Sequence, residues 1–264
     1  MHKSARTFVM PNAWDAGSAR ILEGLGFPAL ATTSAGLAYA LGVKDSRKAL
    51  SRQQVMENAK SIVEATSLPV SGDLENGFGD APEAVAETIR QAIDIGLSGG
   101  AIEDATGEAA HPIYPFEHAV ARIRAAVDAR GSRPFLITAR AENYVCGRPD
   151  LDDTIKRLLA FEAAGADVLY APGLADLATV KAIREAVKRP LNVVVGLVDA
   201  DYTIADLSAL GVTRISTGGS LARAALGEMK RAATELRTLG TFTYASRAMS
   251  DADASAEMRA TTPR

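Results

Sequence analysis

Two acidic residues followed by two glycines form the segment best suited to chemistry. The apolar run that begins at Leu68 ends in Asp73 and Glu75, and Gly77 and Gly79 follow. On an extended strand, residues two apart point to the same side, so both carboxylates are expected on one face at the C-terminal end of a strand. Glycine permits the tight turn or close ligand approach that such an end needs. Clustered oxygen donors on a rigid backbone suit Mg2+, although two solvated acids in a polar turn would have the same sequence.

The elements that must position these acids repeat one junction, in which a helix ends at a glycine and a short apolar strand follows within a few residues. The junctions lie at residues 25–30, 95–102, 164–169 and 210–215. Strands that alternate with helices of this length indicate parallel βαβ units. Eight strands are predicted, at 8–11, 29–33, 70–74, 101–103, 135–139, 168–171, 191–195 and 214–217. Eight such units in about 240 residues predict a (β/α)8 TIM-type barrel.

A doubly wound open sheet is the structural alternative, but its glycine-rich fingerprint is missing. Residues 10–15, after the first strand, read Met-Pro-Asn-Ala-Trp-Asp, with no G-x-G-x-x-G. We therefore predict one barrel domain over residues 1–240. Residues 241–264 are polar and lack strong periodicity, so we expect a tail that is mobile or lies against a neighbouring subunit.

The composition excludes several classes of protein. A chain of 264 residues with 47% hydrophobic residues can bury one large core. The net charge of -3, without a basic run, argues against a nucleic-acid partner. No apolar run approaches the roughly 20 residues that cross a bilayer, and residues 1–7 lack the apolar middle of a signal peptide, so we expect a cytoplasmic protein without membrane contact. One cysteine, Cys146, and three scattered histidines argue against a disulfide or a zinc site.

In (β/α)8 barrels the chemistry lies at the C-terminal ends of the strands. The second strand ends in small residues whose backbone amides can approach an anion, the third and fourth end in acids, and the fifth ends in an arginine. In chain order these candidate residues are Thr33, Ser34, Ala35, Asp45, Asp73, Glu75, Glu103 and Arg140. Because clustered acids without a counter-ion repel one another, the set predicts a divalent metal site that faces an anionic substrate. A purely structural ion pair between Glu103 and Arg140 is the alternative.

Five segments, in this order, resemble the isocitrate lyase and phosphoenolpyruvate mutase superfamily over about residues 8–236. They are ALGVKDS at 40–46, GDLENGFG at 72–79, IED at 102–104, TAR at 138–140 and AAGAD at 163–167. The second segment is similar to the D-x-D-x-G-[YF]-G pattern that the family usually shows. The resemblance implies a barrel that depends on Mg2+, or alternatively Mn2+. It also implies cleavage or formation of C–C or C–P bonds in short 2-oxo acids through a metal-stabilised enolate.

The resemblance also implies roles for the candidate residues. Asp73 would hold the metal most directly, and the residues acting directly or through metal-bound water would be Glu75, Glu103 and Asp45. Arg140 would bind the charged end of the substrate, and the amides of Thr33, Ser34 and Ala35 would bind its carboxylate. Family members tend to form dimers or tetramers, which implies a homodimer or homotetramer that exchanges the last barrel helix, residues 220–236.

Two departures from the family pattern reduce the number of activities that the resemblance allows. The isocitrate and methylisocitrate lyases carry a cysteine on the loop after strand four, whereas residues 105–112 here read ATGEAAHP and form a shorter loop. Cys146 follows strand five, so its position does not allow it to replace the cysteine of the lyases. The mutases carry a histidine after strand six, where this chain has Ala-Pro-Gly at 171–173. His111 is the candidate acid in the loop and we place it among the substrate-contacting residues, with an ordinary solvated histidine as the alternative.

A 2-oxo acid chelates Mg2+ through its carboxylate and keto oxygen, and the metal stabilises the charge that collects on that oxygen when the bond at C3 breaks. We therefore predict a carbon–carbon lyase or decarboxylase that acts on a small 2-oxo or 2-hydroxy dicarboxylate such as oxaloacetate. The alternatives are a C–P hydrolase or mutase acting on phosphonopyruvate-like substrates and a 2-oxo acid binding protein without catalysis. A phosphate-binding barrel that uses residues 216–220 at a helix N-terminus is a further alternative.

Overall fold

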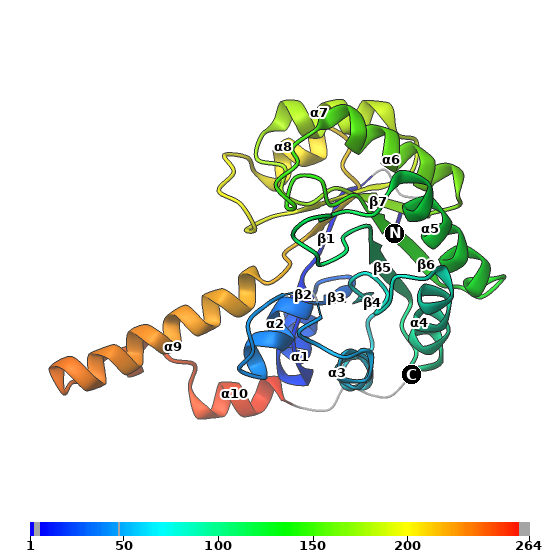
Figure 1. Ribbon diagram of the computed structural model, residues 1–264. Helices are drawn as coiled ribbons and strands as arrows, with labels where there is room; N and C mark the ends of the chain where they lie inside the picture. Colours follow the sequence, from blue (N-terminus) through cyan, green and yellow to red (C-terminus); the bar gives the residue numbers. More distant parts are fainter. Residues whose placement is uncertain (3–5, 47, 259–264) are drawn as a thin grey trace.

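Parallel strands in one sheet close into a barrel in the computed structural model, which describes residues 1–2, 6–46 and 48–258 (Figure 1). The sheet has nine strands in the order β1-β9-β8-β7-β6-β5-β4-β3-β2. Their bounds are β1 Phe8–Met10, β2 Asn12–Ala13, β3 Leu30–Thr32, β4 Val70–Asp73, β5 Gly99–Glu103, β6 Leu136–Arg140, β7 Val168–Tyr170, β8 Leu191–Val194 and β9 Arg214–Ser216. The predicted (β/α)8 barrel is confirmed, with each predicted strand present.

The strand predicted at 8–11 ends at Met10, and a further short strand, β2, begins after Pro11, which has no N–H to give to a sheet. β1 pairs with β9, and β2 pairs with β3, so the two pieces together close the barrel. We call this point of closure the seam, and the Asn12 side chain fixes it through hydrogen bonds. Its Nδ2 donates to the carbonyl of Thr32 at 2.6 Å, and its Oδ1 accepts the backbone N–H groups of Thr217 and Gly218, both at 2.9 Å.

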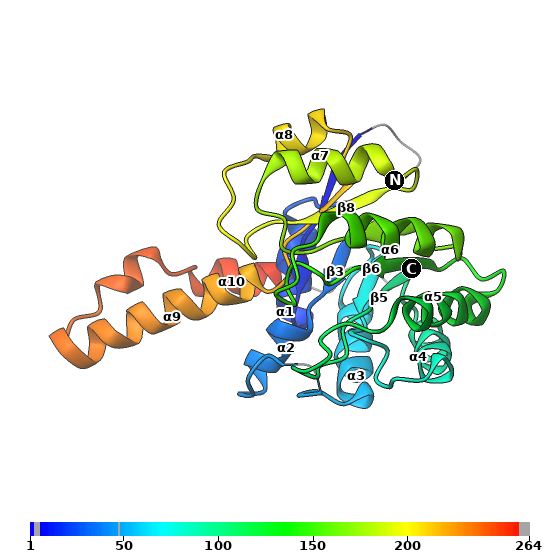
Figure 2. The same ribbon diagram turned by 45° about the horizontal axis from the view of Figure 1, so that its top comes forward.

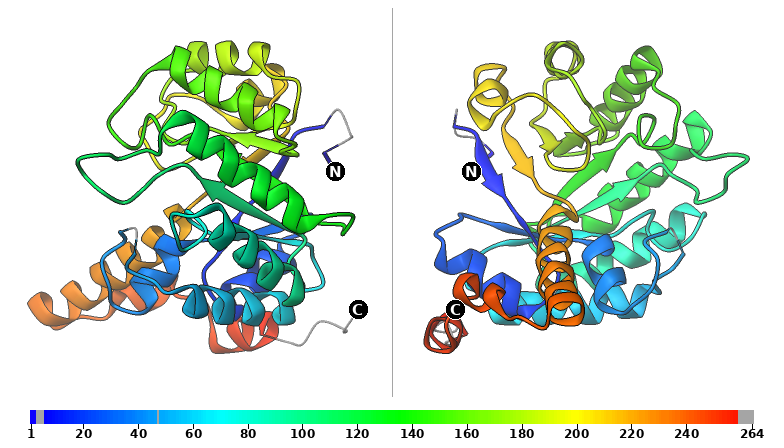
Figure 3. Two further views of the ribbon diagram at one scale, coloured as in Figure 1. Left: turned by 45° about the vertical axis from the view of Figure 1, so that its right-hand side comes forward. Right: turned by 90° about the vertical axis from the view of Figure 1, so that its left-hand side faces the viewer.

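Helices cover the outside of the sheet (Figure 3). In chain order the helices are α1 Ala16–Gly24, α2 Ser34–Ala40, α3 Arg52–Ala65, α4 Pro82–Asp94, α5 Phe116–Arg130, α6 Leu151–Ala163, α7 Leu177–Ala186, α8 Ile204–Ala209, α9 Ser220–Leu239, the short 3-10 helix η1 Thr243–Arg247 and α10 Asp251–Glu257. The glycine junctions of the sequence lie where helices end. Gly96 and Gly165, for example, have φ of 89° and 101°, a left-handed conformation that ends a helix at little cost only for glycine.

The last long helix, α9, projects away from the barrel (Figures 1 and 2). Within it only Ala222 is buried. The polar segment that follows folds back, and the side chain of Arg20 on α1 donates to the carbonyl of Met258 just after α10. Residues 259–264 lie outside the described part of the chain, and the division into a barrel domain and a tail stays a prediction. No helix in the described ranges has the length and apolar character to cross a membrane.

A charged side chain crosses the barrel interior below its C-terminal end. Arg214, only 3% exposed, donates from Nε to Asn192 Oδ1 at 2.8 Å and from Nη2 to Thr138 Oγ1 at 3.0 Å. Both partners are neutral, and no described carboxylate forms an ion pair with Arg214. Burial lowers the pKa of its guanidinium to about 10. The fold therefore disfavours the charged form relative to the unfolded chain.

Replacing this arginine with methionine should stabilise the protein. Because the folded pKa of about 10 lies below the ordinary pKa of arginine, the destabilisation is fully present at neutral pH and begins to decline only above pH 10. We expect Arg214→Met to raise the free energy of unfolding by about 1–2 kcal/mol, after the lost hydrogen bonds are deducted. Urea unfolding at pH 7 measures this. Arg130→Met, which breaks the ion pair between Arg130 and Asp167, should lower stability, and an equal loss in both variants would contradict the expectation.

Candidate active site

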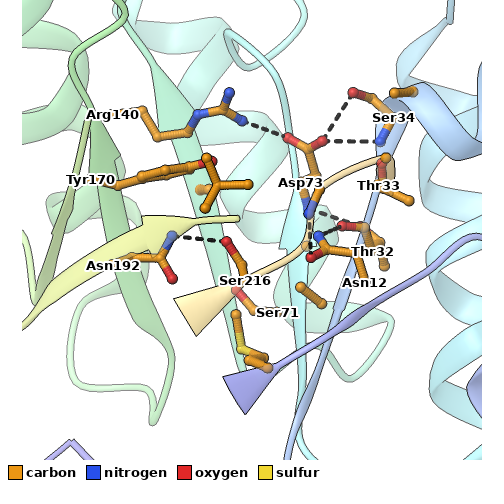
Figure 4. Close-up of a pocket in the computed structure, with 18 of the residues that line it drawn as sticks. Asn12, Thr32, Thr33, Ser34, Ser71, Asp73, Arg140, Tyr170, Asn192 and Ser216 are labelled. Carbon is orange, nitrogen blue, oxygen red and sulfur yellow. Dashed lines mark hydrogen bonds and ion pairs between the residues drawn. The ribbon is translucent and has the colours of Figure 1, made fainter. Parts of the chain in front are cut away.

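Asp73 is the centre of the polar cluster at the C-terminal ends of the strands (Figure 4). It is the last residue of β4 and borders a cavity of about 160 Å³. Its Oδ2 accepts two hydrogen bonds from Ser34, from the backbone N–H and from the hydroxyl, both at 2.9 Å. Its Oδ1 accepts from Nη1 of Arg140 at 2.9 Å. The Asp73 side chain is thus held between the start of α2 and the end of β6, as Figure 4 shows.

Arg140 contacts a different carboxylate through each of its three nitrogens. Nη1 meets Asp73 at 2.9 Å, Nη2 meets Glu103 at 3.1 Å, and Nε meets Glu142 at 2.9 Å. Its guanidinium also lies 5.0 Å from the centre of the Tyr170 ring, in cation–π geometry. Burial acts to lower the pKa of Arg140, but these carboxylates together raise it well above its ordinary value. The ion pair between Glu103 and Arg140 is therefore present, as one contact of a larger network.

Glu75 reaches the site by a route that differs from the predicted one. The expectation that Glu75 and Asp73 share one strand face is wrong, because β4 ends at Asp73 and Glu75 lies in a turn with φ of 47°. Glu75 nevertheless lines the mouth of the site with Asp45, Glu103 and Arg140. Burial, followed by repulsion from the nearby acids, raises the pKa of Glu75 to about 8. A left-handed non-glycine residue is strained, and such residues are concentrated at functional sites.

The polar cluster offers oxygen donors to a divalent cation. Among the described residues, no three His, Cys, Asp or Glu side chains converge at metal-ligand spacing. The oxygens are nevertheless of the type that Mg2+ prefers. Among the described residues at the barrel mouth, the guanidinium of Arg140 faces several acids, namely Asp45, Asp73, Glu75, Glu103 and Glu142. This excess of negative charge, expressed in the raised pKa of Glu75, fits a hard cation bound partly through water.

The raised pKa of Glu75 predicts how pH acts on the metal-free protein. An acid whose folded pKa is about 8 instead of 4.5 contributes stability below pH 4.5 that is lost as the pH rises to about 8, by up to about 1.4 kcal/mol per pH unit. We expect the melting temperature to fall over this range, and Mg2+ to restore more of it at pH 8 than at pH 6. Thermal unfolding with and without Mg2+ measures both effects. Glu75→Gln should flatten both profiles; unchanged profiles would contradict the assignment.

The other predicted residues divide into two groups. Thr33, Ser34 and Ala35 line the same cavity as Asp73, where β3 passes into α2, and Asp45 lines its mouth. His111 is not brought to the site. Its side chain is exposed, and its backbone N–H donates to the carbonyl of Glu108 in a turn. His111 does not line the described cavity.

Further polar side chains line the cavity, among them Tyr170 and Asn192, to which sequence reasoning assigns no role. The Tyr170 ring lies beneath Arg140, and Nδ2 of Asn192 donates to Oγ of Ser216 at 2.9 Å (Figure 4). Burial, chiefly, raises the pKa of the Tyr170 hydroxyl above its ordinary value, so it stays protonated. The feature of the sequence that could have identified these residues is a polar residue within a short apolar strand. That signal shows which residues point inward, but not which of them reach the cavity.

Comparisons with known proteins agree with this geometry. Residues 1–237 match the family described as phosphoenolpyruvate phosphomutase. An oxaloacetate decarboxylase from Rhodopseudomonas palustris (strain BisB5) is 32% identical, over 86% of this chain and 78% of that protein. A candidate lyase/mutase of known structure from Burkholderia cenocepacia J2315 is 53% identical, with a TM-score of 0.94 over 97% of this chain and 91% of the other. The structure of a phosphonopyruvate hydrolase in complex with oxalate and Mg2+ is 25% identical, with a TM-score of 0.84 over 97% and 91%.

Proposed function

The chain belongs to the phosphoenolpyruvate phosphomutase family, and we propose that it is a Mg2+-dependent carbon–carbon lyase or decarboxylase for a small 2-oxo or 2-hydroxy dicarboxylate such as oxaloacetate. The observation that carries this proposal is the excess of carboxylates around Arg140 at the barrel mouth. A site of this charge suits a divalent cation together with an anionic ligand. The similarity to an oxaloacetate decarboxylase supports the choice of substrate.

Each part of the site has a separate task. Asp73, with Glu75, Glu103 and Asp45, would hold Mg2+, which when bound supplies a positive charge that stabilises the negative charge developing on the substrate's keto oxygen. Ser34 orients the Asp73 carboxylate through two hydrogen bonds. Arg140 binds and orients the charged end of the substrate, and the segment 33–35 faces its carboxylate.

A second candidate activity is hydrolysis of a C–P bond. The similarity to phosphonopyruvate hydrolase favours it. The chain itself places Ala171, Pro172 and Gly173 after β7. Because no histidine follows this strand, the carbon–carbon lyase remains the first proposal.

The direct test is pyruvate release from oxaloacetate with Mg2+ or Mn2+. It is run beside EDTA, beside Asp73→Ala and beside a blank with metal only, because Mg2+ alone slowly decarboxylates this acid. Release that needs both protein and metal supports the decarboxylase. Release that matches the blank rejects oxaloacetate as the decarboxylation substrate, and methylmalate-type acids and phosphonopyruvate then decide between the lyase and the hydrolase. If none of these acids reacts, a 2-oxo acid binding protein without catalysis becomes the leading proposal.

We also propose a homodimer or homotetramer that exchanges α9. Leu226, Met229 and Leu236 on this helix are 39%, 63% and 46% exposed. An amphipathic helix with one buried residue needs another surface to cover its apolar face. Sedimentation velocity tests this proposal, and a monomer across micromolar concentrations would reject it. The expected cytoplasmic location stays a prediction.

A further inference from the structure

Arg157 is a buried arginine on α6, in the helix layer outside the barrel. It is 5% exposed and does not line the described cavity at the strand ends. Its Nη1 donates to Asp104 Oδ2 and to the carbonyl of Tyr114, both at 3.0 Å, and its Nε donates to Asp153 Oδ2 at 2.8 Å. A guanidinium fixed at three points holds its partners in one geometry.

Asp104 carries this constraint to the strand that bears Arg140. It follows β5 directly and is 3% exposed. While its Oδ2 faces Arg157, its Oδ1 accepts the backbone N–H of Glu142 at 2.8 Å. Its own N–H donates to the carbonyl of Arg140 at 3.2 Å. Asp104 thus fixes the backbone on both sides of Ala141, just beyond the end of β6.

Glu142 completes the connection to the guanidinium in the site. Its side chain is 1% exposed, and Oε1 accepts from Nε of Arg140 at 2.9 Å. The other two nitrogens of Arg140 rest on Asp73 and Glu103, which the proposed function assigns to the metal. Glu142 is therefore the carboxylate that can hold Arg140 independently of the metal.

We propose that Arg157 is a positioning residue for substrate recognition, which sets the orientation of Arg140 through Asp104 and Glu142. This inference rests on the proposed function in giving Arg140 the charged end of the substrate. Arg157 itself does not touch the substrate. Its loss leaves Asp104 buried without its cation, frees the backbone of Glu142, and lets the Arg140 guanidinium turn away from the substrate.

The experiment uses two readouts on the full-length protein. The first is the dissociation constant of oxalate in saturating Mg2+, measured by calorimetry. The second is hydrogen-exchange protection of the Arg140 Nε–H, observed by NMR, which needs no substrate. We expect Arg157→Met to weaken oxalate binding about tenfold, the size of one charge-assisted hydrogen bond, and to abolish the protection. Arg157→Lys should recover part of both effects, and Arg157→Met combined with Glu142→Gln should be no worse than the more severe single variant.

The matched control lies at the other end of the barrel. Arg130 on α5 donates to Asp167, whose carboxylate also accepts the backbone N–H of Ile137, so the contact is of the same kind although it is more exposed. Arg130→Met should lower stability but keep oxalate affinity and the Arg140 protection. The positioning role is rejected if Arg157→Met behaves like this control. If the wild-type protein binds no oxalate, the proposed function is rejected instead. The hydrogen-exchange protection of the Arg140 Nε–H is then the only readout that tests the positioning role.

Discussion

Replacement of Asp73 with alanine should lower metal-dependent turnover by about 10³-fold or more, to the level of the metal-only blank. The reason is that Asp73 accepts two hydrogen bonds from Ser34 and one from Arg140 and, in the proposed function, would hold the metal most directly. A loss of that size is typical when the group that fixes a catalytic charge is removed. Steady-state pyruvate release over a range of Mg2+ concentrations measures it.

Two variants separate chemistry from folding in this prediction. Asp73→Asn keeps the shape and can still accept from Ser34, so it should melt near the wild-type temperature and yet lose turnover. Ser34→Ala removes only the hydroxyl bond to Asp73 and should cost about tenfold or less. Substantial Mg2+-dependent activity in folded Asp73→Asn would show that the metal is held elsewhere.

Arg140→Met should act on the two ligands in opposite directions. Removing the guanidinium leaves Asp73, Glu103 and Glu142 without their shared cation, so Mg2+ should bind more tightly. The substrate loses its charged partner, so KM for oxaloacetate should rise by about 10²-fold while kcat changes less. Calorimetric titration with Mg2+ and steady-state kinetics measure the two effects separately. If the affinity for Mg2+ falls together with the affinity for substrate, Arg140 has a general structural role instead.

The barrel could be predicted from the sequence because its signals are local. Each strand is a short apolar run, and the helix ends carry glycine, so the alternation is visible without tertiary information. Asp73 and Arg140 could be found for the same reason, since each is the last residue of its strand. The location of a site at these ends then follows from the fold.

The remaining features depend on contacts between distant segments. Strand periodicity predicts that Glu75 shares a strand face with Asp73, but Glu75 lies in the turn after β4, where its backbone is left-handed. The roles of Asp104 and Glu142 arise where three segments meet, and no spacing in the sequence indicates that contact. In the sequence Arg214 looks like an ordinary surface cation at the start of a strand, and only barrel closure reveals that it is buried. Likewise, the sequence does not show that His111 lies away from the cavity.

The seam at Pro11 has a consequence for how the chain folds. Thr7 contacts Val212 and Asn12 contacts Thr217 across 205 residues of sequence in each case, so the closing pairs carry a large loop entropy and are expected to form late. Asn12 is also part of the cavity wall beside Asp73. The βα units can therefore assemble in an open sheet while the cavity lacks one side. During refolding, ligand binding should recover later than helical structure, because the first and last strands must pair before the cavity is complete.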